Sequence, residues 1–528
     1  MKVVLADAVA AECAEVLAAE GIETVVTHGR PVAALHAALA DADGLVVRSS
    51  TQVDAALMDR APQLKVVGRA GAGVDNVDVA TATQRGILVM NAPGANTLAA
   101  AEHAFAMLMA VCRNIPAAHA SMAGGSWAKK DYMGVELYGK TLGVIGMGRI
   151  GSTVAQRARA FGMRVLGFDP FLPPEAAEKL GVELAELDAI LPQADFLTLH
   201  SPLNERTRHL LARESLARCK PGVRIVNCAR GGLIDEAALV EALDSGHVAG
   251  AALDVFEAEP LPSEHPLRGH PRLVLTPHLG ASTAEAQVQV AARIAEQIAG
   301  YLLRGAVVNA VNMTSVDAEL AERLAPYQRL AEAMGLLHGR LIGGRFEELQ
   351  VEAAGSILEL PLRALTASAL KGFLGEQLNQ TVNVVNAPSV AQERGYRFSE
   401  VRGQDADGYA GLLTVRVRSE AGEHLLQGTV FGQRFFKLVR IDEYFIETAP
   451  KGDMLFASND DVPGRLAGMA GVLARHGVNV ANMALGRHRE AGRALAAFNL
   501  DASLPADALA ELRAIDGVTW AQSVEFAR

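Results

Sequence analysis

The chain has 528 residues, of which 50% are hydrophobic, 5% aromatic and 21% charged, and its formal net charge is -11. A chain of this length is too long for one hydrophobic core, so we expect three or four domains. The low aromatic content is typical of parallel α/β layers. Because Lys and Arg are scattered along the chain rather than clustered, the charge argues against nucleic acid or an anionic membrane as a partner.

The N-terminal sequence MKVVLADAVA passes from a strand into a helix and lacks the layout of a signal peptide. No apolar run reaches the roughly 18 residues that a transmembrane helix needs. The cysteines form no CxxC pair; they are Cys13, Cys112, Cys219 and Cys228. We therefore expect a cytoplasmic protein with reduced thiols and no contact with a membrane.

Residues 1–97 alternate short aliphatic strands with helices, which predicts a small domain with a parallel sheet. The expected strands are KVVLAD (2–7), IETVVTH (22–28), GLVVRSS (44–50), LKVVGRAG (64–71) and ILVMN (87–91). The next helix, AAAEHAFAMLMAV at 99–111, is apolar on most sides and should be buried, either in a core or between domains.

Residues 140–281 repeat the alternation with stronger signals, as expected for a second parallel sheet in a domain that spans residues 98–281. Its strands are TLGVIG (141–146), RVLGFD (164–169), FLTLHSP (196–202), RIVNCA (224–229), GAALDV (250–255) and LVLTPH (273–278). A long helix at 283–303 should return the chain to the first domain. That domain would then comprise residues 1–97 and 282–310.

Two further units follow. Residues 311–450 contain two helices (318–337 and 362–378) and then consecutive strands within 411–441, which indicates an α+β domain. Residues 453–528 read β-α-β-β-α-β, a ferredoxin-like order.

The sequence TLGVIGMGRIG places Gly146, Gly148 and Gly151 in G-x-G-x-x-G spacing, between an aliphatic strand and a helix. A second strand ends at Asp169, 18 residues after Gly151. This is the context of a dinucleotide-binding fingerprint, in which the glycines admit a pyrophosphate and the acid accepts hydrogen bonds from the ribose. NAD is favoured over NADP because Asp169 would repel a 2′-phosphate. The alternative is a glycine turn in a domain that binds no cofactor.

Polar residues follow three of the expected strands. Arg230 follows one strand. Asp254 lies at the end of the next strand and Glu259 follows it, and His278 ends a third strand. The carboxyl ends of parallel strands share one edge of the sheet, so these side chains should converge. Arg230 can bind a substrate carboxylate, His278 can exchange a hydroxyl proton, and Glu259 can orient the imidazole. Taken singly, each has a structural alternative, such as a surface ion pair or a loop position.

Five segments carry a resemblance to a known family: GRAGAGVDNVD, GKTLGVIGMGRIG, NCARGGLIDEAAL, ALDVFEAEP and LTPHLGAST. In this order they resemble the motifs of the D-isomer-specific 2-hydroxyacid dehydrogenases, and especially of the long-type D-3-phosphoglycerate dehydrogenases. The resemblance implies that Arg230, Glu259 and His278 are the catalytic residues. Formate dehydrogenases of this superfamily have Gln in place of Glu259, so the Glu favours a hydroxyacid substrate over formate. The implied NAD contacts, beyond the glycines, are Arg149, Ile150, Asp169, Ser201, Cys228, Ala229, Asp254, Gly280 and Ala281.

The substrate residues implied by this resemblance come mainly from the first domain. The loop Gly71, Ala72, Gly73 and Val74 would present backbone N–H groups to the substrate carboxylate, and Asn96 matches a substrate-side position. Arg48 and Arg69 are candidates for the substrate phosphate, with Lys129 and Lys130 reaching in from a neighbouring subunit. The alternative for these four cations is a solvated surface charge.

The segment from Asn459 to Val480, NDDVPGRLAGMAGVLARHGVNV, reads as a turn, an amphipathic helix, a glycine stop and the start of a strand. It resembles the ACT domain, which usually binds amino acids where two such domains pair. The preceding unit resembles the intervening domain of the long-type enzymes. The resemblance implies L-serine as the effector, with Asn459, Asp461 and Asn479 as contacts. The alternative is an ACT fold retained only for oligomerisation.

The expected fold is therefore two Rossmann-like doubly wound α/β domains, an α+β intervening domain and a βαββαβ ACT domain. The expected function is NAD-dependent oxidation of 3-phospho-D-glycerate to 3-phosphooxypyruvate, the first step of L-serine synthesis, in a homotetramer and without a metal. One alternative is a dehydrogenase for another 2-hydroxyacid, such as glyoxylate or hydroxypyruvate. Another is a non-catalytic NAD-binding regulator.

Overall fold

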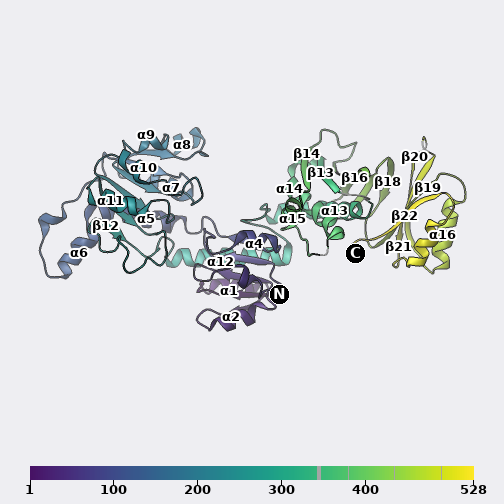
Figure 1. The fold of residues 1–528 in the computed structure, drawn as a ribbon, viewed down its shortest axis with the longest axis horizontal. Helices are drawn as coiled ribbons and strands as arrows, with labels where there is room; N and C mark the ends of the chain where they lie inside the picture. The colour runs from purple at the N-terminus through teal and green to yellow at the C-terminus, as the bar shows by residue number, and fades with distance from the viewer. Residues whose placement is uncertain (342–345, 379, 433, 489, 491, 528) are drawn as a thin grey trace.

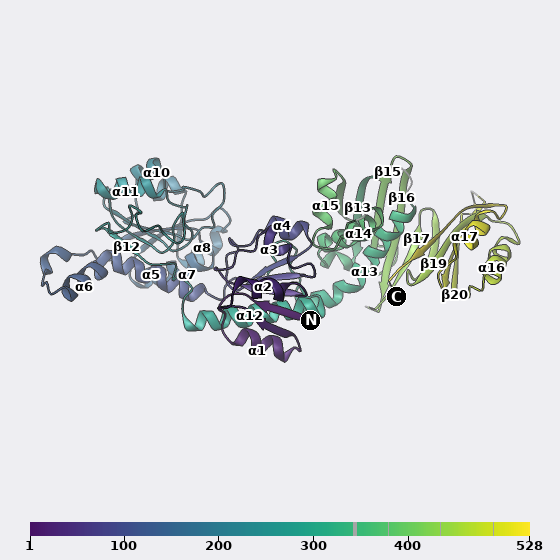
Figure 2. The same cartoon turned by 60° about the horizontal axis from the view of Figure 1, so that its bottom comes forward.

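The computed structural model describes residues 1–341, 346–378, 380–432, 434–488, 490 and 492–527. The molecule is elongated, and its four sheets lie one after another along the long axis (Figures 1 and 2). The sheet built from residues 141–275 is at one end, that of the N-terminal residues is in the middle, and the two C-terminal sheets follow. Among the described helices, none has the length and apolar character to cross a membrane.

Five parallel strands form the N-terminal sheet, in the order β2-β1-β3-β4-β5. The parallel sheet predicted from the aliphatic runs is confirmed, and β3 is buried throughout because helices cover both faces. The elements are β1 (Lys2–Leu5), α1 (Glu12–Ala19), β2 (Glu23–Val26), α2 (Val32–Leu39), β3 (Gly44–Val47), α3 (Ala55–Met58), β4 (Val66–Arg69), α4 (Val79–Gln84) and β5 (Leu88–Asn91).

The second sheet has seven parallel strands in the order β12-β11-β10-β9-β6-β7-β8. The strand order reverses between β6 and β9, which is where open α/β sheets bind ligands. The short strand β8 was not predicted, because both of its residues are exposed and it has no apolar run. The elements are β6 (Thr141–Ile145), α7 (Arg149–Ala160), β7 (Arg164–Phe168), α8 (Pro174–Leu180), β8 (Glu183–Leu184), α9 (Leu187–Ile190), β9 (Phe196–Leu199), α10 (Arg213–Arg218), β10 (Val223–Asn227), α11 (Glu236–Asp244), β11 (Val248–Leu253) and β12 (Leu273–Leu275).

Two long helices join these domains. Helix α5 (Thr97–Arg113) packs into the core of the second domain, and α12 (Ala284–Arg304) returns to pack on the first. Gly68 on β4 allows this close approach, because a Cβ there would lie 2.5 Å from Cδ1 of Ile298. Beyond α5, helix α6 (Ile115–Ala123) and the 3₁₀ helix η1 (Lys129–Tyr132) belong to an arm that extends from the molecule (Figure 1).

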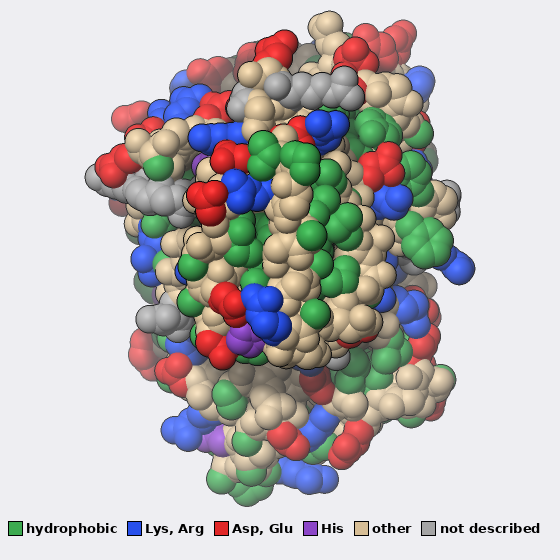
Figure 3. Space-filling model, turned by 90° about the vertical axis from the view of Figure 1, so that its right-hand side faces the viewer, with side chains coloured by type: hydrophobic (Ala, Val, Ile, Leu, Met, Phe, Trp, Pro, Cys, Tyr) green, Lys and Arg blue, Asp and Glu red, His purple; other side chains and the backbone are tan. Residues whose placement is uncertain are grey.

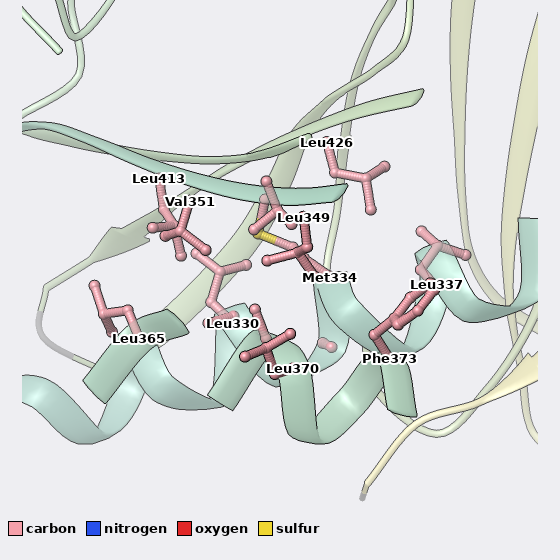
Figure 4. Packing of buried hydrophobic residues seen from close by; sticks show 14 of the residues in the cluster. Leu330, Met334, Leu337, Leu349, Val351, Leu365, Leu370, Phe373, Leu413 and Leu426 are labelled. Atoms are coloured by element: carbon pink, nitrogen blue, oxygen red, sulfur yellow. The ribbon is translucent and has the colours of Figure 1, made fainter. Parts of the chain in front are cut away.

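The third unit is a six-stranded sheet in the order β14-β13-β15-β16-β17-β18. Its α+β class is confirmed, but the strands at residues 346–355, 397–402 and 444–448 lie outside the predicted segment 411–441 and were not predicted. The first of them, FEELQVEAAG, mixes polar and apolar residues and so gives no clear strand signal. Figure 4 shows leucines of the two long helices of this unit packed against the sheet. The elements are α13 (Ala318–Leu341), β13 (Phe346–Gly355), η2 (Ser356–Glu359), α14 (Leu362–Gln377), α15 (Ala387–Glu393), β14 (Arg397–Arg402), β15 (Gly411–Ser419), β16 (Gly422–Phe431), β17 (Phe435–Ile441) and β18 (Tyr444–Thr448).

The last unit has the predicted β-α-β-β-α-β order and an antiparallel sheet, β20-β21-β19-β22. Met454 and Phe456 on one face of β19 belong to the core of the preceding unit, whereas Leu455 and Ala457 on the other face belong to a separate core of the last unit. Its elements are β19 (Asp453–Asp460), α16 (Arg465–Arg475), β20 (Val480–His488), β21 (Arg493–Leu500), α17 (Ala506–Arg513) and β22 (Val518–Glu525).

Candidate active site

A cleft of about 860 Å³ lies between the first two domains. It is lined by residues at the carboxyl ends of strands from both sheets, including Arg69 from β4, Cys228 after β10 and Thr276 after β12. This placement is the one expected for open parallel sheets. Arg230, Glu259 and His278 all line this cleft, so the structure brings the three predicted catalytic residues together.

His278 and Glu259 form a hydrogen-bonded pair, with 2.7 Å between Nδ1 and Oε2. The other carboxylate oxygen of Glu259 accepts a hydrogen bond from the backbone N–H of Phe256 at 3.0 Å. The His278 side chain is 49% exposed, so the edge of its ring that does not face Glu259 is open to a ligand. Because Nδ1 is engaged, Nε2 is the nitrogen left to exchange a proton with that ligand.

The pair shifts both pKa values toward the charged forms. The hydrogen bond that His278 donates to Glu259 raises the pKa of His278, although burial and the nearby Arg230 oppose the shift. Burial alone would raise the pKa of Glu259, but the hydrogen bonds from His278 and Phe256 outweigh it and lower that pKa. Glu259 is therefore a carboxylate at neutral pH, and it favours the protonated imidazole.

Arg230 connects the two domains across the cleft. Its Nε lies 3.1 Å from Oδ2 of Asp75, and its Nη1 donates to the carbonyl of Ala229 at 2.6 Å. A side chain at Gly73 would collide with Nη2 of Arg230, so the guanidinium lies directly against the glycine-rich loop. The residue expected to bind a substrate carboxylate is thus next to the loop expected to supply N–H groups to it.

Two more arginines line the same end of the cleft. Arg48 donates from Nη1 to the carbonyl of Ala8 at 3.2 Å, and its backbone N–H donates to Asp7 at 2.6 Å. Burial lowers the pKa of Arg69, the nearby Arg230 lowers it further, and its Nε is buried without a hydrogen-bond partner. This concentration of positive charge and the unpaired donor favour an anionic ligand. An anion would offset the repulsion between the arginines and accept a hydrogen bond from Arg69 Nε.

Of the other predicted substrate residues of the first domain, four line the cleft and one does not. Gly71, Ala72, Gly73 and Asn96 line the cleft, whereas Val74 lies in the glycine-rich loop without lining it. Lys129 and Lys130 are exposed on the arm and do not line the cleft of their own chain.

The glycine motif has the geometry that a dinucleotide needs. Gly146 has a φ of 94°, and a Cβ on it would lie 2.7 Å from the His200 carbonyl. A Cβ on Gly151 would collide with the carbonyl of Gly146, so helix and strand pack closely there. Nothing lies within 4 Å of a Cβ built on Gly148, the N-cap of α7, which leaves room for a pyrophosphate beside the free N–H groups of the helix. Asp169 follows β7, and its Oδ2 accepts from Met147 N at 2.9 Å.

Most other predicted cofactor residues face the cleft: Ile150, Ser201, Cys228, Ala229, Gly280 and Ala281. Two do not. Arg149 lines a separate hollow of about 440 Å³ with Gly94 and Arg293, and Asp254 is completely buried behind the segment that carries His278.

Sequence reasoning missed His103, which lies on α5. Its Nε2 is 3.1 Å from Oδ1 of Asp254, and the Cys228 thiol is close to both groups. Three such side chains can bind a metal, but the Asp254 oxygens already accept from Thr276, Leu279 and Gly280. Burial also raises the pKa of Cys228 and keeps its thiol protonated. We therefore interpret the cluster as a hydrogen-bond network.

In the C-terminal domain the structure separates the predicted effector residues. Asp461 is close to Asn459 and follows the end of β19 that pairs with Arg493. Asn479 precedes Val480, which pairs with Leu500 at the opposite end of the sheet. A single copy of the domain thus does not bring Asn479 to Asp461.

Each of these residues already has a contact within its own domain. Asp461 forms an ion pair with Arg487, with 2.6 Å between Oδ2 and Nη2. Asn479 donates to Asp501 at 2.6 Å. Asn459 donates to the carbonyl of Asp460, and its Oδ1 is buried without a partner.

Family models match three parts of the chain. The NAD-binding domain of D-isomer-specific 2-hydroxyacid dehydrogenases matches residues 105–280, the intervening domain of D-3-phosphoglycerate dehydrogenase matches 323–442, and the ACT domain matches 454–517. Together these models follow the order of the second, third and fourth sheets.

Curated relatives extend the similarity to nearly the whole chain. A protein named D-3-phosphoglycerate dehydrogenase from Synechocystis is 43% identical over 92% of this chain and 87% of its own. A protein of the same name from Archaeoglobus fulgidus is 39% identical over 99% and 100%.

Two similar solved structures each cover about three fifths of this chain. One is a glyoxylate reductase from Paecilomyes thermophila (32% identity, TM-score 0.54, 59% of this chain and 98% of that one). Another is the NAD complex of a formate dehydrogenase from Staphylococcus aureus (30% identity, TM-score 0.54, 60% and 100%).

Proposed function

We infer that this chain, which belongs to the D-isomer-specific 2-hydroxyacid dehydrogenases and within them to the D-3-phosphoglycerate dehydrogenases with an ACT domain, oxidises 3-phospho-D-glycerate to 3-phosphooxypyruvate with NAD. This reaction is the first step of L-serine synthesis. The observation that best supports the assignment is a single cleft lined by a His–Glu pair together with Arg230 from one domain and Arg48 and Arg69 from the other.

The chemistry follows from the side chains. The glycine motif and Asp169 would hold NAD, which would supply the acceptor for the hydride from C2 of the substrate. Arg230 can hold the C1 carboxylate through its planar fork and polarise the neighbouring C2 oxygen. Nε2 of His278 takes the proton of the C2 hydroxyl, while Glu259 fixes the ring and stabilises the imidazolium that forms. We propose that Arg48 and Arg69 bind the phosphate, since Arg268, the other arginine that lines the cleft, already donates to the carbonyls of Pro262 and Leu261.

The assignment can be tested by steady-state formation of NADH with 3-phosphoglycerate, glycerate and lactate as alternative substrates. We expect the highest kcat/KM with 3-phosphoglycerate. A higher kcat/KM with an unphosphorylated 2-hydroxyacid would assign the enzyme to that substrate instead. Absence of turnover with all of them would favour an NAD-binding regulator.

Glu259→Gln should move the pH profile of oxidation to lower pH. Oxidation requires neutral His278, so kcat/KM rises with pH through the pKa of that imidazole. The hydrogen bond to the Glu259 carboxylate is the largest cause that raises this pKa, and Asp254 raises it further. Without the Glu259 carboxylate the pKa falls, and the rising limb should shift to lower pH while the maximal rate drops. A limb that stays in place or moves upward would contradict this role.

We propose that L-serine binds the ACT domain between two copies of the chain. Asn459 and Asp461 lie at one end of the sheet and Asn479 at the other, so two copies in opposite orientation would bring the three residue types together. Titration calorimetry with L-serine tests this proposal, and binding should be lost in Asp461→Ala. Normal serine affinity in that variant would place the site elsewhere.

Arg487→Met should strengthen serine binding by up to about fivefold. Arg487 occupies the Asp461 carboxylate that the serine ammonium group would use, and an exposed ion pair of this kind is worth about 1 kcal/mol or less. Arg475→Met, which breaks the exposed ion pair with Glu511 in the same domain, serves as the matched control. Weaker binding in Arg487→Met would instead make Arg487 a ligand contact.

We propose a cytoplasmic homotetramer. The four cysteines are free, which suits a reducing compartment. The arm between α5 and β6 exposes large apolar side chains, among them Trp127 and Met133, as expected for a surface that a second copy covers. The edge strand β20 exposes Met483 and Leu485, and hydrophobic side chains also reach the surface at this end of the molecule (Figure 3). Sedimentation equilibrium would measure the number of subunits.

A further inference from the structure

The segment that carries His278 is tied to a buried carboxylate. Asp254, at the end of β11, is fully buried, and its Oδ1 accepts from Thr276 Oγ1 at 2.6 Å and from Leu279 N at 2.7 Å. Its Oδ2 accepts from Gly280 N at 2.9 Å, and its backbone carbonyl accepts from His278 N at 2.9 Å. These four bonds surround His278, whose φ of 57° is unusual for a residue with a side chain.

Helix α5 supplies a fifth partner from outside this segment. Nε2 of His103 lies 3.1 Å from Oδ1 of Asp254 and 3.2 Å from Oγ1 of Thr276. One turn further along the same face of the helix, the sulfur of Met107 lies 3.8 Å from Oγ1 of Thr276. His103 is 20% exposed and does not line the cleft, so it has no direct access to the substrate.

We propose that His103 is a positioning residue that holds Asp254, and through it residues 276–280, in the arrangement that presents His278 to the substrate. A buried carboxylate requires hydrogen-bond donors, and it becomes costly when one of them is lost. The left-handed backbone at His278 needs such external support, because it is less stable than a relaxed conformation. Because His103 lies on α5, the helix that also joins the two domains, its contact ties residues 276–280 to an element outside their own segment.

Two variants separate this role from simple packing. His103→Leu fills similar space without a donor, whereas His103→Gln places an amide nitrogen near the position of Nε2. We expect kcat to fall about tenfold in His103→Leu, since a hydrogen bond to a charged group is lost, and to recover most of this loss in His103→Gln. KM for the hydroxyacid should change little, because Arg230, Arg48 and Arg69 are untouched. His28→Leu, at an exposed position after β2, is the control and should match wild type.

Hydrogen exchange of the full-length protein tests the same proposal without turnover. Leu279 and Gly280 donate their amides to Asp254, so peptides that cover residues 275–282 should exchange faster in His103→Leu than in wild type and His103→Gln. The kinetic measurement rests on the proposed function, but the exchange measurement does not. If wild type oxidises no hydroxyacid, the proposed function fails and exchange alone decides the role of His103.

Two outcomes would overturn the proposal. One is unchanged exchange of residues 275–282 in His103→Leu. The other is a His103→Gln variant as impaired as His103→Leu, since it would show that the lost donor is not the cause.

Discussion

Replacing His278 with glutamine should lower kcat for 3-phosphoglycerate oxidation by about 10²- to 10⁴-fold, the usual contribution of a positioned acid–base group. Glutamine preserves a polar side chain of similar size but cannot take the hydroxyl proton at neutral pH. NADH binding, followed by fluorescence, should stay near the wild-type value because the glycine motif and Asp169 are unchanged. Steady-state rates from pH 6 to pH 10, read by NADH absorbance, provide the measurement.

The residual activity of His278→Gln should also lose the rise with pH that the imidazole causes. His28→Gln, an exposed histidine after β2, is the matched control and should keep both the rate and the pH profile. A His278→Gln enzyme that keeps the wild-type pH limb would transfer the proton-accepting role to another group. A rate within a few-fold of wild type would remove His278 from the mechanism.

The convergence of Arg230, Glu259 and His278 could be predicted because each follows a parallel strand of one sheet. Strands β10, β11 and β12 are neighbours, and their carboxyl ends necessarily meet at one edge. The aliphatic runs specify these strands locally, so no knowledge of side-chain packing is needed. The ion pair between Arg230 and Asp75 could not be predicted in this way, because it depends on how closely the two domains approach.

Residues whose role depends on tertiary register could not be placed. Asp461 and Asn479 are only 18 positions apart in sequence, yet the antiparallel pairing of β19 and β20 with β21 puts them at opposite ends of the ACT sheet. The contact of Arg487 with Asp461 depends on the same pairing.

His103 was hidden for a related reason. It lies in an apolar helix whose sequence indicates only burial, and its partner Asp254 is 151 residues later. A histidine inside such a helix was the available signal, because a buried imidazole needs a hydrogen-bond partner.

Replacing Arg230 with lysine should lower kcat/KM for 3-phosphoglycerate by about 10²- to 10³-fold, comparable to the loss of one donor that stabilises developing charge on an oxyanion. Lysine keeps the positive charge but lacks the planar fork, so it cannot hold the C1 carboxylate and the C2 oxygen together. Arg213→Lys is a suitable control, because Arg213 is exposed and forms a surface ion pair with Glu241 outside the cleft.

The division of this loss between kcat and KM shows what Arg230 does. If it only bound the carboxylate, KM would rise and kcat would stay the same; if it also polarises the C2 oxygen, kcat must fall as well. We expect KM to rise and kcat to fall, because the Arg230 guanidinium lies against Gly73 of one domain while its backbone follows β10 of the other. A lysine at position 230 has no planar fork and therefore cannot contact the C1 carboxylate and the C2 oxygen at the same time. Unchanged kcat/KM in Arg230→Lys would remove Arg230 from the catalytic set and leave carboxylate recognition to Arg48, Arg69 and the glycine-rich loop.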